Sequence, residues 1–180
     1  MYRFTRKYSL LLMVLITTMG MGQSLKPDAA SSKIAFTIKN LGINTTGYFK
    51  DISGTIVFDL KNPTSAKFDI EIPTKSLDTD NNLRDSHLSK EEYFHVSQYP
   101  NIKFTSTKVT ATKPGQYIVE GKLTIKNTTK NISFPFTANA QEGGILFKGT
   151  LPLNRRDYSV GGRSFTLSDN LTLNLTVLAK

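Results

Sequence analysis

The sequence predicts an all-β protein in which eight strands form an antiparallel, lipocalin-like barrel with a short helical insert at about residues 80–95. Two observations predict this fold. Apolar and polar residues alternate with a period of two over most of the chain from residue 33 onward, which is typical of strands with one buried face. Turn-forming pairs separate the alternating segments and favour short connections: Asn62-Pro63, Pro114-Gly115 and Gly143-Gly144.

The first half of the chain supplies four of the predicted strands. In residues 34–38, Ile34, Phe36 and Ile38 share one face because side chains two positions apart point the same way. The segments 52–60, 66–72 and 102–104 repeat the pattern, with isoleucine and phenylalanine on the apolar face. Each therefore predicts a strand that turns one face to a core.

The second half supplies the other four predicted strands, 117–125, 132–138, 145–153 and 171–177. Glycines fall in the apolar phase of three strands, at Gly54, Gly121 and Gly149. Two interpretations stay open: the glycines mark bends where the barrel turns a corner, or they leave a hydrophobic channel between the phenylalanines.

Two classes of barrel share this alternation, because an outer-membrane barrel turns its apolar face to lipid and a soluble barrel turns it inward. A membrane barrel needs aromatic girdles at both interfaces. This chain has no tryptophan, and its phenylalanines lie in the middle of the predicted strands. The sequence therefore predicts a soluble barrel.

Residues 1–22 have the composition of a signal peptide. Arg3, Arg6 and Lys7 precede an apolar run over residues 10–21, and Gly20 and Gly22 provide small residues before a cleavage site at Gln23. The chain has no cysteine, so neither lipid attachment at a cysteine nor a disulfide is expected. We expect a periplasmic or secreted protein whose residues 23–180 form a single domain.

The formal net charge of +9 raises the question of a nucleic-acid partner. The lysines are scattered along the predicted strands, often beside acidic residues, and form no dense basic block. This distribution is typical of a solvated outer face, and no nucleic-acid partner is expected.

The predicted insert interrupts the alternation with charged and short polar residues. Thr79 or Asp80 is expected to cap a helix that runs through residues 83–88, and Ser89 with Glu92 matches a capping box for a second helical turn. The apolar residues of the insert are expected to dock it on the barrel as a lid or plug; they are Leu83, Leu88, Tyr93 and Phe94.

Both histidines of the chain, His87 and His95, fall in this insert. They are eight residues apart with a helix break expected at Ser89 between them, a spacing that fits no recurrent metal site. The sequence also has no Gly-x-Ser-x-Gly motif, no cysteine nucleophile and no glycine-rich phosphate loop. We therefore expect neither an enzyme nor a metal site, and no cofactor.

Four stretches of sequence resemble the YceI-like family of exported bacterial proteins. The most specific is RDSHLSKEEYFHVSQYPNIKFTSTKV at residues 84–109. The others are FTIKNLGINTTGYFKDISGTIVFD at 36–59, GKLTIKNTTKNISFPF at 121–136 and LNRRDYSVGG at 153–162. The resemblance implies an elongated lipocalin-like barrel with a helical insert and an apolar tunnel that holds an isoprenoid chain, such as a quinone tail.

The resemblance also implies the residues of the site. The tunnel is expected to be lined by Phe36, Ile38, Phe58, Ile70, Leu88, Phe94, Phe104, Leu123, Phe134, Phe136, Phe147 and Leu151. The rim or head-group residues are expected to be Asn40, Arg84, Asp85 and His87, with Arg84 and Asp85 as an ion pair. Asn40 stands where many family members carry a histidine, and His95 stands where the family usually has an acid or an amide.

Three functions follow from these expectations. The leading one is non-catalytic binding, storage or transport of a polyisoprenoid lipid, with transient contact to a membrane surface and a homodimer as further expectations. The alternative is a barrel with a filled core that serves as a protein-interaction module at the cell envelope. A third is an enzyme acting on the lipid, for which Tyr117 is the one phenol in the apolar phase.

Overall fold

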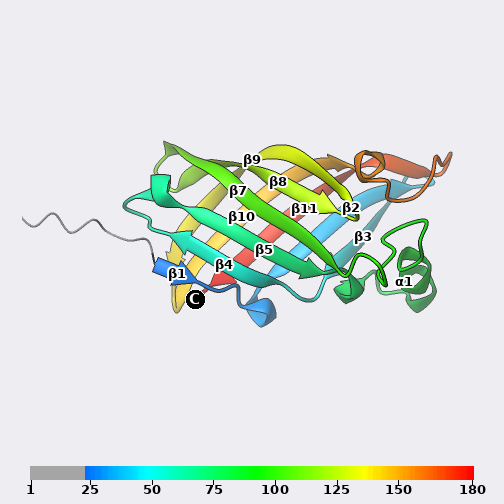
Figure 1. Ribbon diagram of the computed structural model, residues 1–180, viewed down its shortest axis with the longest axis horizontal. Helices are drawn as coiled ribbons and strands as arrows, with labels where there is room; N and C mark the ends of the chain where they lie inside the picture. Colours follow the sequence, from blue (N-terminus) through cyan, green and yellow to red (C-terminus); the bar gives the residue numbers. More distant parts are fainter. Residues whose placement is uncertain (1–22) are drawn as a thin grey trace, which may run out of the picture.

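The computed structural model describes residues 23–180, and the predicted signal peptide lies outside the described residues. The described chain forms one antiparallel sheet of eleven strands that curls round an apolar interior (Figure 1). The strands are β1 (Gln23–Leu25), β2 (Lys33–Asn40), β3 (Ile43–Phe49), β4 (Ser53–Phe58), β5 (Lys67–Pro73), β6 (Leu77–Asp78), β7 (Asn101–Lys113), β8 (Gln116–Ile125), β9 (Thr128–Gln141), β10 (Gly144–Asn154) and β11 (Leu167–Ala179).

The helical elements are short. The described residues contain one α-helix, α1 (Asn82–Leu88), and four 3-10 turns: η1 (Ala29–Ser31), η2 (Pro63–Ser65), η3 (Thr74–Ser76) and η4 (Arg155–Tyr158). Within residues 23–180, no helix is both long and apolar enough to cross a membrane. Helix α1 and the segment that begins with η4 lie at the same end of the molecule, and the C-terminus lies near the other end (Figure 1).

The strand order is β1-β4-β5-β7-β8-β9-β10-β11-β2-β3-β6. At one edge, β1 pairs with β4, and the residues that follow β1 bond to the end of β11: Lys26 N donates to Lys180 O at 2.7 Å and Asp28 N to Leu178 O at 2.8 Å. At the other edge, β6 follows β5 through η3 and pairs with β3. Each edge of the sheet thus connects with its opposite part, although β6 pairs with only Tyr48 and Phe49 of β3.

All eight alternating segments are strands, but the prediction of eight strands is wrong because β1, β3 and β6 were missed. Strands β1 and β6 have three and two residues, too few for a periodic pattern. In β3, the positions opposite the inward Phe36 and Ile38 are Gly47 and Thr45. A strand whose inward positions are small or polar shows no hydrophobic alternation, so only its pairing with β2 identifies it.

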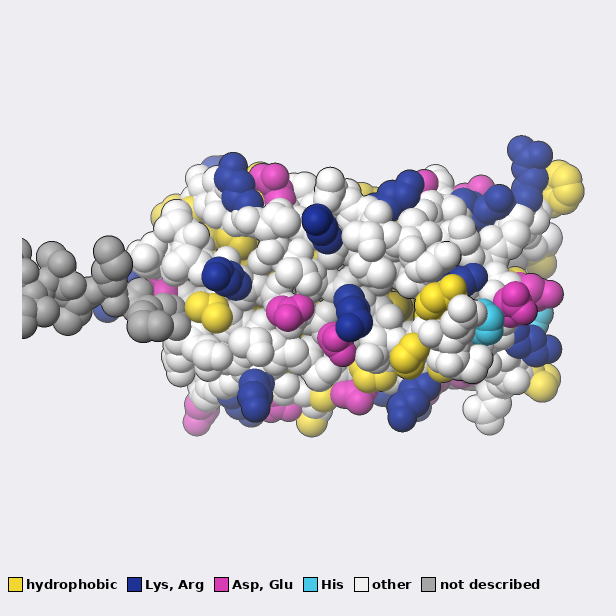
Figure 2. All heavy atoms as spheres, viewed as in Figure 1, with side chains coloured by type: hydrophobic (Ala, Val, Ile, Leu, Met, Phe, Trp, Pro, Cys, Tyr) yellow, Lys and Arg dark blue, Asp and Glu magenta, His cyan; other side chains and the backbone are white. Residues whose placement is uncertain are grey.

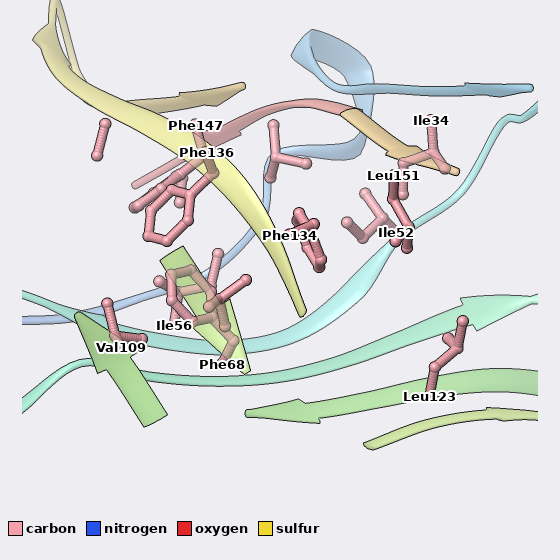
Figure 3. Packing of buried hydrophobic residues seen from close by; sticks show 14 of the residues in the cluster. Ile34, Ile52, Ile56, Phe68, Val109, Leu123, Phe134, Phe136, Phe147 and Leu151 are labelled. Atoms are coloured by element: carbon pink, nitrogen blue, oxygen red, sulfur yellow. The ribbon is translucent and has the colours of Figure 1, made fainter. Parts of the chain in front are cut away.

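One end of the interior is filled by aromatic rings. The Phe58 ring centroid lies 5.3 Å from that of Tyr117 and 5.1 Å from that of Phe147, both edge to face. Phe68 and Phe136 complete the cluster, with ring centroids 5.5 Å apart. Figure 3 shows Phe68, Phe136 and Phe147 directed into the interior from different strands. Edge-to-face packing of this kind is favourable beyond the area it buries.

The glycines in the apolar phase do not all have the same role. Gly54 has φ +127°, and a Cβ atom there would lie 2.0 Å from Asp69 O. A Cβ atom on Gly121 would lie 2.6 Å from both a Phe104 ring carbon and Thr105 O. These two glycines permit close approach of backbone to its neighbours, in keeping with the bend interpretation.

The helical insert is present, but its predicted caps are wrong. Asn81 is the N-cap of α1, and its side chain accepts a hydrogen bond from Arg84 N at 3.0 Å. Asp80 has φ +57°, outside the extended conformation that an N-cap residue adopts. Ser89 Oγ donates to Ser86 O at 2.7 Å, and the residues after it form turns without a capping box. The docking expected of Leu83 is also wrong, because that side chain is 86% exposed.

Candidate ligand-binding cavity

The interior next to the aromatic cluster holds a cavity of about 430 Å³. Its lining comes from β2 to β5 and from β7 to β11, and most of it is aliphatic or aromatic. Its size falls within the range of pockets that bury most of a small ligand. An apolar chain would find contacts on all sides of it.

The strand register explains why the lining is apolar. Leu173 of β11 is paired with Phe36 of β2 on one side and with Leu151 of β10 on the other. Residues directly opposite each other in antiparallel strands point to the same face, so these three side chains form one inward row. Figure 3 shows Leu151, Phe134 and Ile52 within the same interior.

The cavity contains all of the predicted tunnel residues except Phe58. Phe58 is only 1% exposed and does not line the cavity. It packs behind Phe68, Phe136 and Phe147, which do line it. The prediction for Phe58 is therefore wrong, because the residue belongs to the filled end of the interior.

Several lining residues were missed. They include Ile34, Phe49, Ile52, Ile56, Phe68, Leu171, Leu173, Leu175 and Val177. Most of them lie in the apolar phase of the predicted strands, so the same alternation that identified β11 could have identified its contribution to the cavity. Of the three glycines in the apolar phase, Gly149 alone lines the cavity.

Polar side chains gather at the cavity end that carries α1 and the segment after η4. Asn40, Arg84 and His87 line it as predicted, together with residues that were not predicted, such as Thr45, Ser164 and Thr166. Asp85 does not itself line the cavity, but it is bonded to Thr79, which does. The interior thus has one filled aromatic end and one polar end.

Arg84 and Asp85 do not form the predicted ion pair within the described chain. Both instead bind Thr79, which is 3% exposed. Arg84 donates from Nε to Thr79 Oγ1 at 2.7 Å and from Nη2 to Thr79 O at 2.6 Å. Asp85 Oδ1 accepts from Thr79 N at 3.0 Å and from Thr79 Oγ1 at 2.5 Å. These bonds fix the start of the insert on the sheet.

The two histidines lie in different surroundings. The His87 ring centroid is 4.9 Å from that of Tyr93, and both residues line the cavity. His95 has φ +48°, packs against Tyr99 and does not line the cavity. In residues 23–180, no group of three or more His, Cys, Asp or Glu side chains is placed to hold a metal ion.

A buried arginine holds the segment on the other side of the polar end. Arg155 is 5% exposed and donates hydrogen bonds to Val160 O at 3.0 Å and Gly162 O at 2.9 Å. It also bonds Ser168 O at 2.9 Å and forms an ion pair with Asp169 at 2.6 Å. Charge-assisted bonds to several carbonyls make this a structural arginine that shapes residues 156–168.

Tyr158 is a site residue that sequence reasoning missed. It is 2% exposed and lines the cavity, and within residues 23–180 its hydroxyl has no hydrogen-bond partner. Burial of the side chain, helped by the charge of Asp157, raises the pKa of the hydroxyl to about 12. Tyr158 therefore keeps its proton at neutral pH and has a free donor.

The insert and the segment after η4 are bonded to each other. Gly161 N donates to Glu92 O at 2.8 Å, and Lys126 Nζ donates to both Glu91 O and Ser159 O at 3.1 Å. At the end of the insert, where the chain returns to the sheet, Thr74 Oγ1 donates a hydrogen bond to Tyr99 O at 2.9 Å. The polar end of the cavity is thus framed by two segments that hold each other in place.

The sequence is similar to curated bacterial proteins. A UPF0312 protein of Pseudomonas syringae pathovar tomato is 35% identical over 168 residues, covering 86% of this chain and 87% of that protein. A UPF0312 protein of Pectobacterium atrosepticum is 43% identical over 137 residues, covering 71% of this chain and 69% of that protein.

Solved structures share the fold. BcnA of Burkholderia cenocepacia has a TM-score of 0.81 at 25% identity, covering 86% of this chain and 99% of that one. A polyisoprenoid-binding domain of Saccharophagus degradans, implicated in plant cell wall breakdown, has a TM-score of 0.70 at 15% identity, covering 87% and 97%. The second likeness concerns the fold alone.

The YceI-like domain family matches residues 25–179, which is nearly all of the described chain. Together with relatives that share a third or more of their residues over most of the length, this match identifies the chain as a member of the YceI-like domain family.

Proposed function

We propose that this protein is a lipocalin-like carrier that binds a polyisoprenoid lipid, such as an isoprenoid quinone, without catalysing a reaction on it. The observation that carries the proposal is the cavity of about 430 Å³ with an apolar lining and one polar end. An isoprenoid lipid has the matching chemistry, with a long branched hydrocarbon tail and a small polar head. The polyisoprenoid-binding domain with the same fold also supports the proposal.

Burial of the tail supplies the driving force. Each CH₂ group removed from water contributes about 0.8 kcal/mol. Ordering a flexible tail opposes binding and reduces the net affinity. Since the lining is mainly hydrocarbon, the carrier discriminates weakly between tails of similar length and more strongly between head groups.

The hydrogen bonds at the polar end indicate which of its residues are available to contact a head group. Arg84 uses Nε and Nη2 on Thr79, and Asp85 is bonded to the same residue, so both serve mainly to hold the insert. Asn40, His87 and Tyr158 line the cavity and are better placed to meet a head group. A free phenol donor suits the carbonyl oxygen of a quinone.

The other two functions have less support. The filled interior that a pure interaction module requires is present only around Phe58 and Tyr117. The enzymatic alternative depended on Tyr117, which packs in that filled end and does not line the cavity. An interaction module with a filled core does not account for an apolar cavity with a polar end.

The basic and apolar pattern of residues 1–22 supports export, so the proposed carrier works in the periplasm or after secretion. The first test is native mass spectrometry of the protein purified from its own host, followed by solvent extraction. A stoichiometric quinone or polyprenyl compound supports the proposal and names the ligand.

A second test adds a short-tailed isoprenoid quinone to the lipid-free protein and compares two variants. Leu173→Trp fills the cavity from β11, whereas Asn174→Trp puts the same ring on the outer face of that strand. We expect Leu173→Trp to abolish quinone binding and Asn174→Trp to retain it. Failure of the unaltered protein to take up any isoprenoid, or equal binding by both variants, would count against the cavity as the site.

A further inference from the structure

Three large apolar side chains project into solvent at the polar end of the cavity. Leu41 and Ile43 are 73% and 71% exposed, and Phe165 is fully exposed at 106%. Exposed apolar groups gathered at one place on a protein surface commonly mark an interaction site. Leu83 of α1, in the insert, is also 86% exposed, whereas Leu60 at 38% and Ile118 at 36% are only just uncovered.

The segments that carry these side chains are neighbours. Leu41 N donates to Thr166 O at 2.8 Å, which places the β2–β3 turn beside the residue after Phe165. Ile43 pairs with Asn40, and Asn40 pairs with Leu167. Residues 40–43 and 163–166 are called the apolar tip below.

The apolar tip is continuous with the cavity. Asn40, Ser164, Thr166 and Leu167 line the cavity, while Leu41, Ile43 and Phe165 beside them do not. In each segment, residues that line the cavity therefore stand directly beside apolar residues that are exposed to solvent. A surface that receives the tip lies directly against the polar end of the cavity.

The charge around the apolar tip is positive. Lys39 and Arg163 lie within or next to its segments, and residues 39–49 and 158–168 contain no aspartate or glutamate. Figure 2 shows hydrophobic side chains beside lysine and arginine at this end of the molecule. Glu91 and Glu92 belong to the insert, which frames the other side of the polar end.

We propose that the apolar tip docks on a bilayer that contains anionic phospholipids, with Leu41, Ile43 and Phe165 entering the lipid. Apolar side chains beside cations are the composition of surfaces that bind at a membrane interface. Docking brings the polar end of the cavity against the lipid from which an isoprenoid would come, and in this respect the inference rests on the proposed carrier function.

The test is co-sedimentation of the protein with vesicles of phosphatidylcholine and phosphatidylglycerol, with phosphatidylcholine vesicles alone for comparison. The tip variant combines Leu41→Asn, Ile43→Thr and Phe165→Ser. Leu41 has φ +51°, a conformation that asparagine adopts more easily than leucine, and threonine keeps the β-branching of a strand residue. The variant is therefore expected to fold.

We expect the unaltered protein to bind the anionic vesicles. The tip variant should bind them at least roughly tenfold more weakly. Binding should also fall as salt is raised, because salt screens the attraction of Lys39 and Arg163 to the lipid. The matched control, Leu60→Ser with Ile118→Thr, removes exposed apolar groups outside the tip and should bind as the unaltered protein does.

The same three proteins are then tested for uptake of a short-tailed isoprenoid quinone from solution, in which the apolar tip takes no part. Vesicle binding without any quinone uptake would support the docking tip and refute the carrier function. Equal vesicle binding by the tip variant and the unaltered protein, or no binding by either, would overturn the docking proposal. A third result would also overturn it: no protein binds vesicles, and the unaltered protein self-associates while the tip variant does not. That result would assign the surface to a second copy of the chain.

Discussion

The hydroxyl of Thr79 donates a hydrogen bond to Asp85 Oδ1 at 2.5 Å, while the Thr79 backbone N donates to the same oxygen at 3.0 Å. Thr79 is nearly inaccessible to solvent. This double contact joins the end of β6 to the first turn of α1 and begins the frame round the polar end of the cavity.

Thr79→Val should destabilise the protein, since valine keeps the shape of threonine but leaves Asp85 and Arg84 without their shared hydroxyl. Loss of a partner from a buried polar group costs about 1–3 kcal/mol. The free energy of unfolding, measured with urea, checks this. Thr105→Val is the matched control, because its hydroxyl bonds Asp69 at 3.2 Å on the exposed surface. Equal losses in the two variants would contradict the role given to Thr79.

Phe58→Ala should cost more stability than Leu173→Ala. Phe58 is closely packed among four aromatic rings, and truncation of such a side chain costs about 3–5 kcal/mol. Leu173 borders the cavity and is only partly buried, so its truncation should cost less. Thermal unfolding of the two lipid-free variants gives the comparison. A smaller loss for Phe58→Ala would mean that the cavity reaches the end where Phe58 packs.

Tyr158→Phe should weaken the binding of an isoprenoid quinone and leave the binding of squalene, which has no head group, unchanged. A single hydrogen bond contributes about 0.5–1.5 kcal/mol, equivalent to roughly a twofold to tenfold change in affinity. Fluorescence or calorimetric titration of the two ligands separates head from tail. Equal effects on both ligands would show that the change acts through packing and not through the hydroxyl.

The pKa of about 12 for Tyr158 also predicts how stability changes with pH. The unfolded chain loses the phenol proton at about pH 10, while the folded chain keeps it to higher pH. Between these values the folded state binds more protons, so the stability contributed by the neutral phenol is present below pH 10 and is lost as pH rises toward 12.

The measurement is the difference in unfolding free energy between the unaltered protein and Tyr158→Phe from pH 8 to pH 12. Because the variant has no phenol at this position, the unaltered protein should lose stability relative to it above pH 10. A constant difference across this range would show that the Tyr158 hydroxyl titrates at its ordinary pKa when folded.

The alternation of residues predicted eight of the eleven strands, and most of the expected tunnel residues that line the cavity lie in its apolar phase. This was sufficient because a period of two reports which face of a strand is buried, and the interior of a curled sheet is one continuous face. The same pattern gives no signal where the inward positions are small or polar, as at Thr45 and Gly47. Strand β3 was therefore identified only through its pairing with β2.

The insert shows a second limit of sequence reasoning. Asp80 and Ser89 are residue types that suit helix caps, yet the cap is Asn81 and Ser89 bonds backward to Ser86. Arg84 and Asp85 are neighbours of opposite charge, but each binds Thr79. Local sequence offers several partners for each polar group, and the tertiary fold selects among them by distance.

By itself, the sequence determined the fold class, the inward face of most strands and the resemblance to the YceI-like family. Only the tertiary structure decided where along the interior each inward residue lies. Phe58 and Phe134 are both phenylalanines in the apolar phase, but one closes the filled end and the other lines the cavity. Alternation gives the direction of a side chain, whereas its depth in the barrel depends on the stagger of strands that are far apart in the sequence.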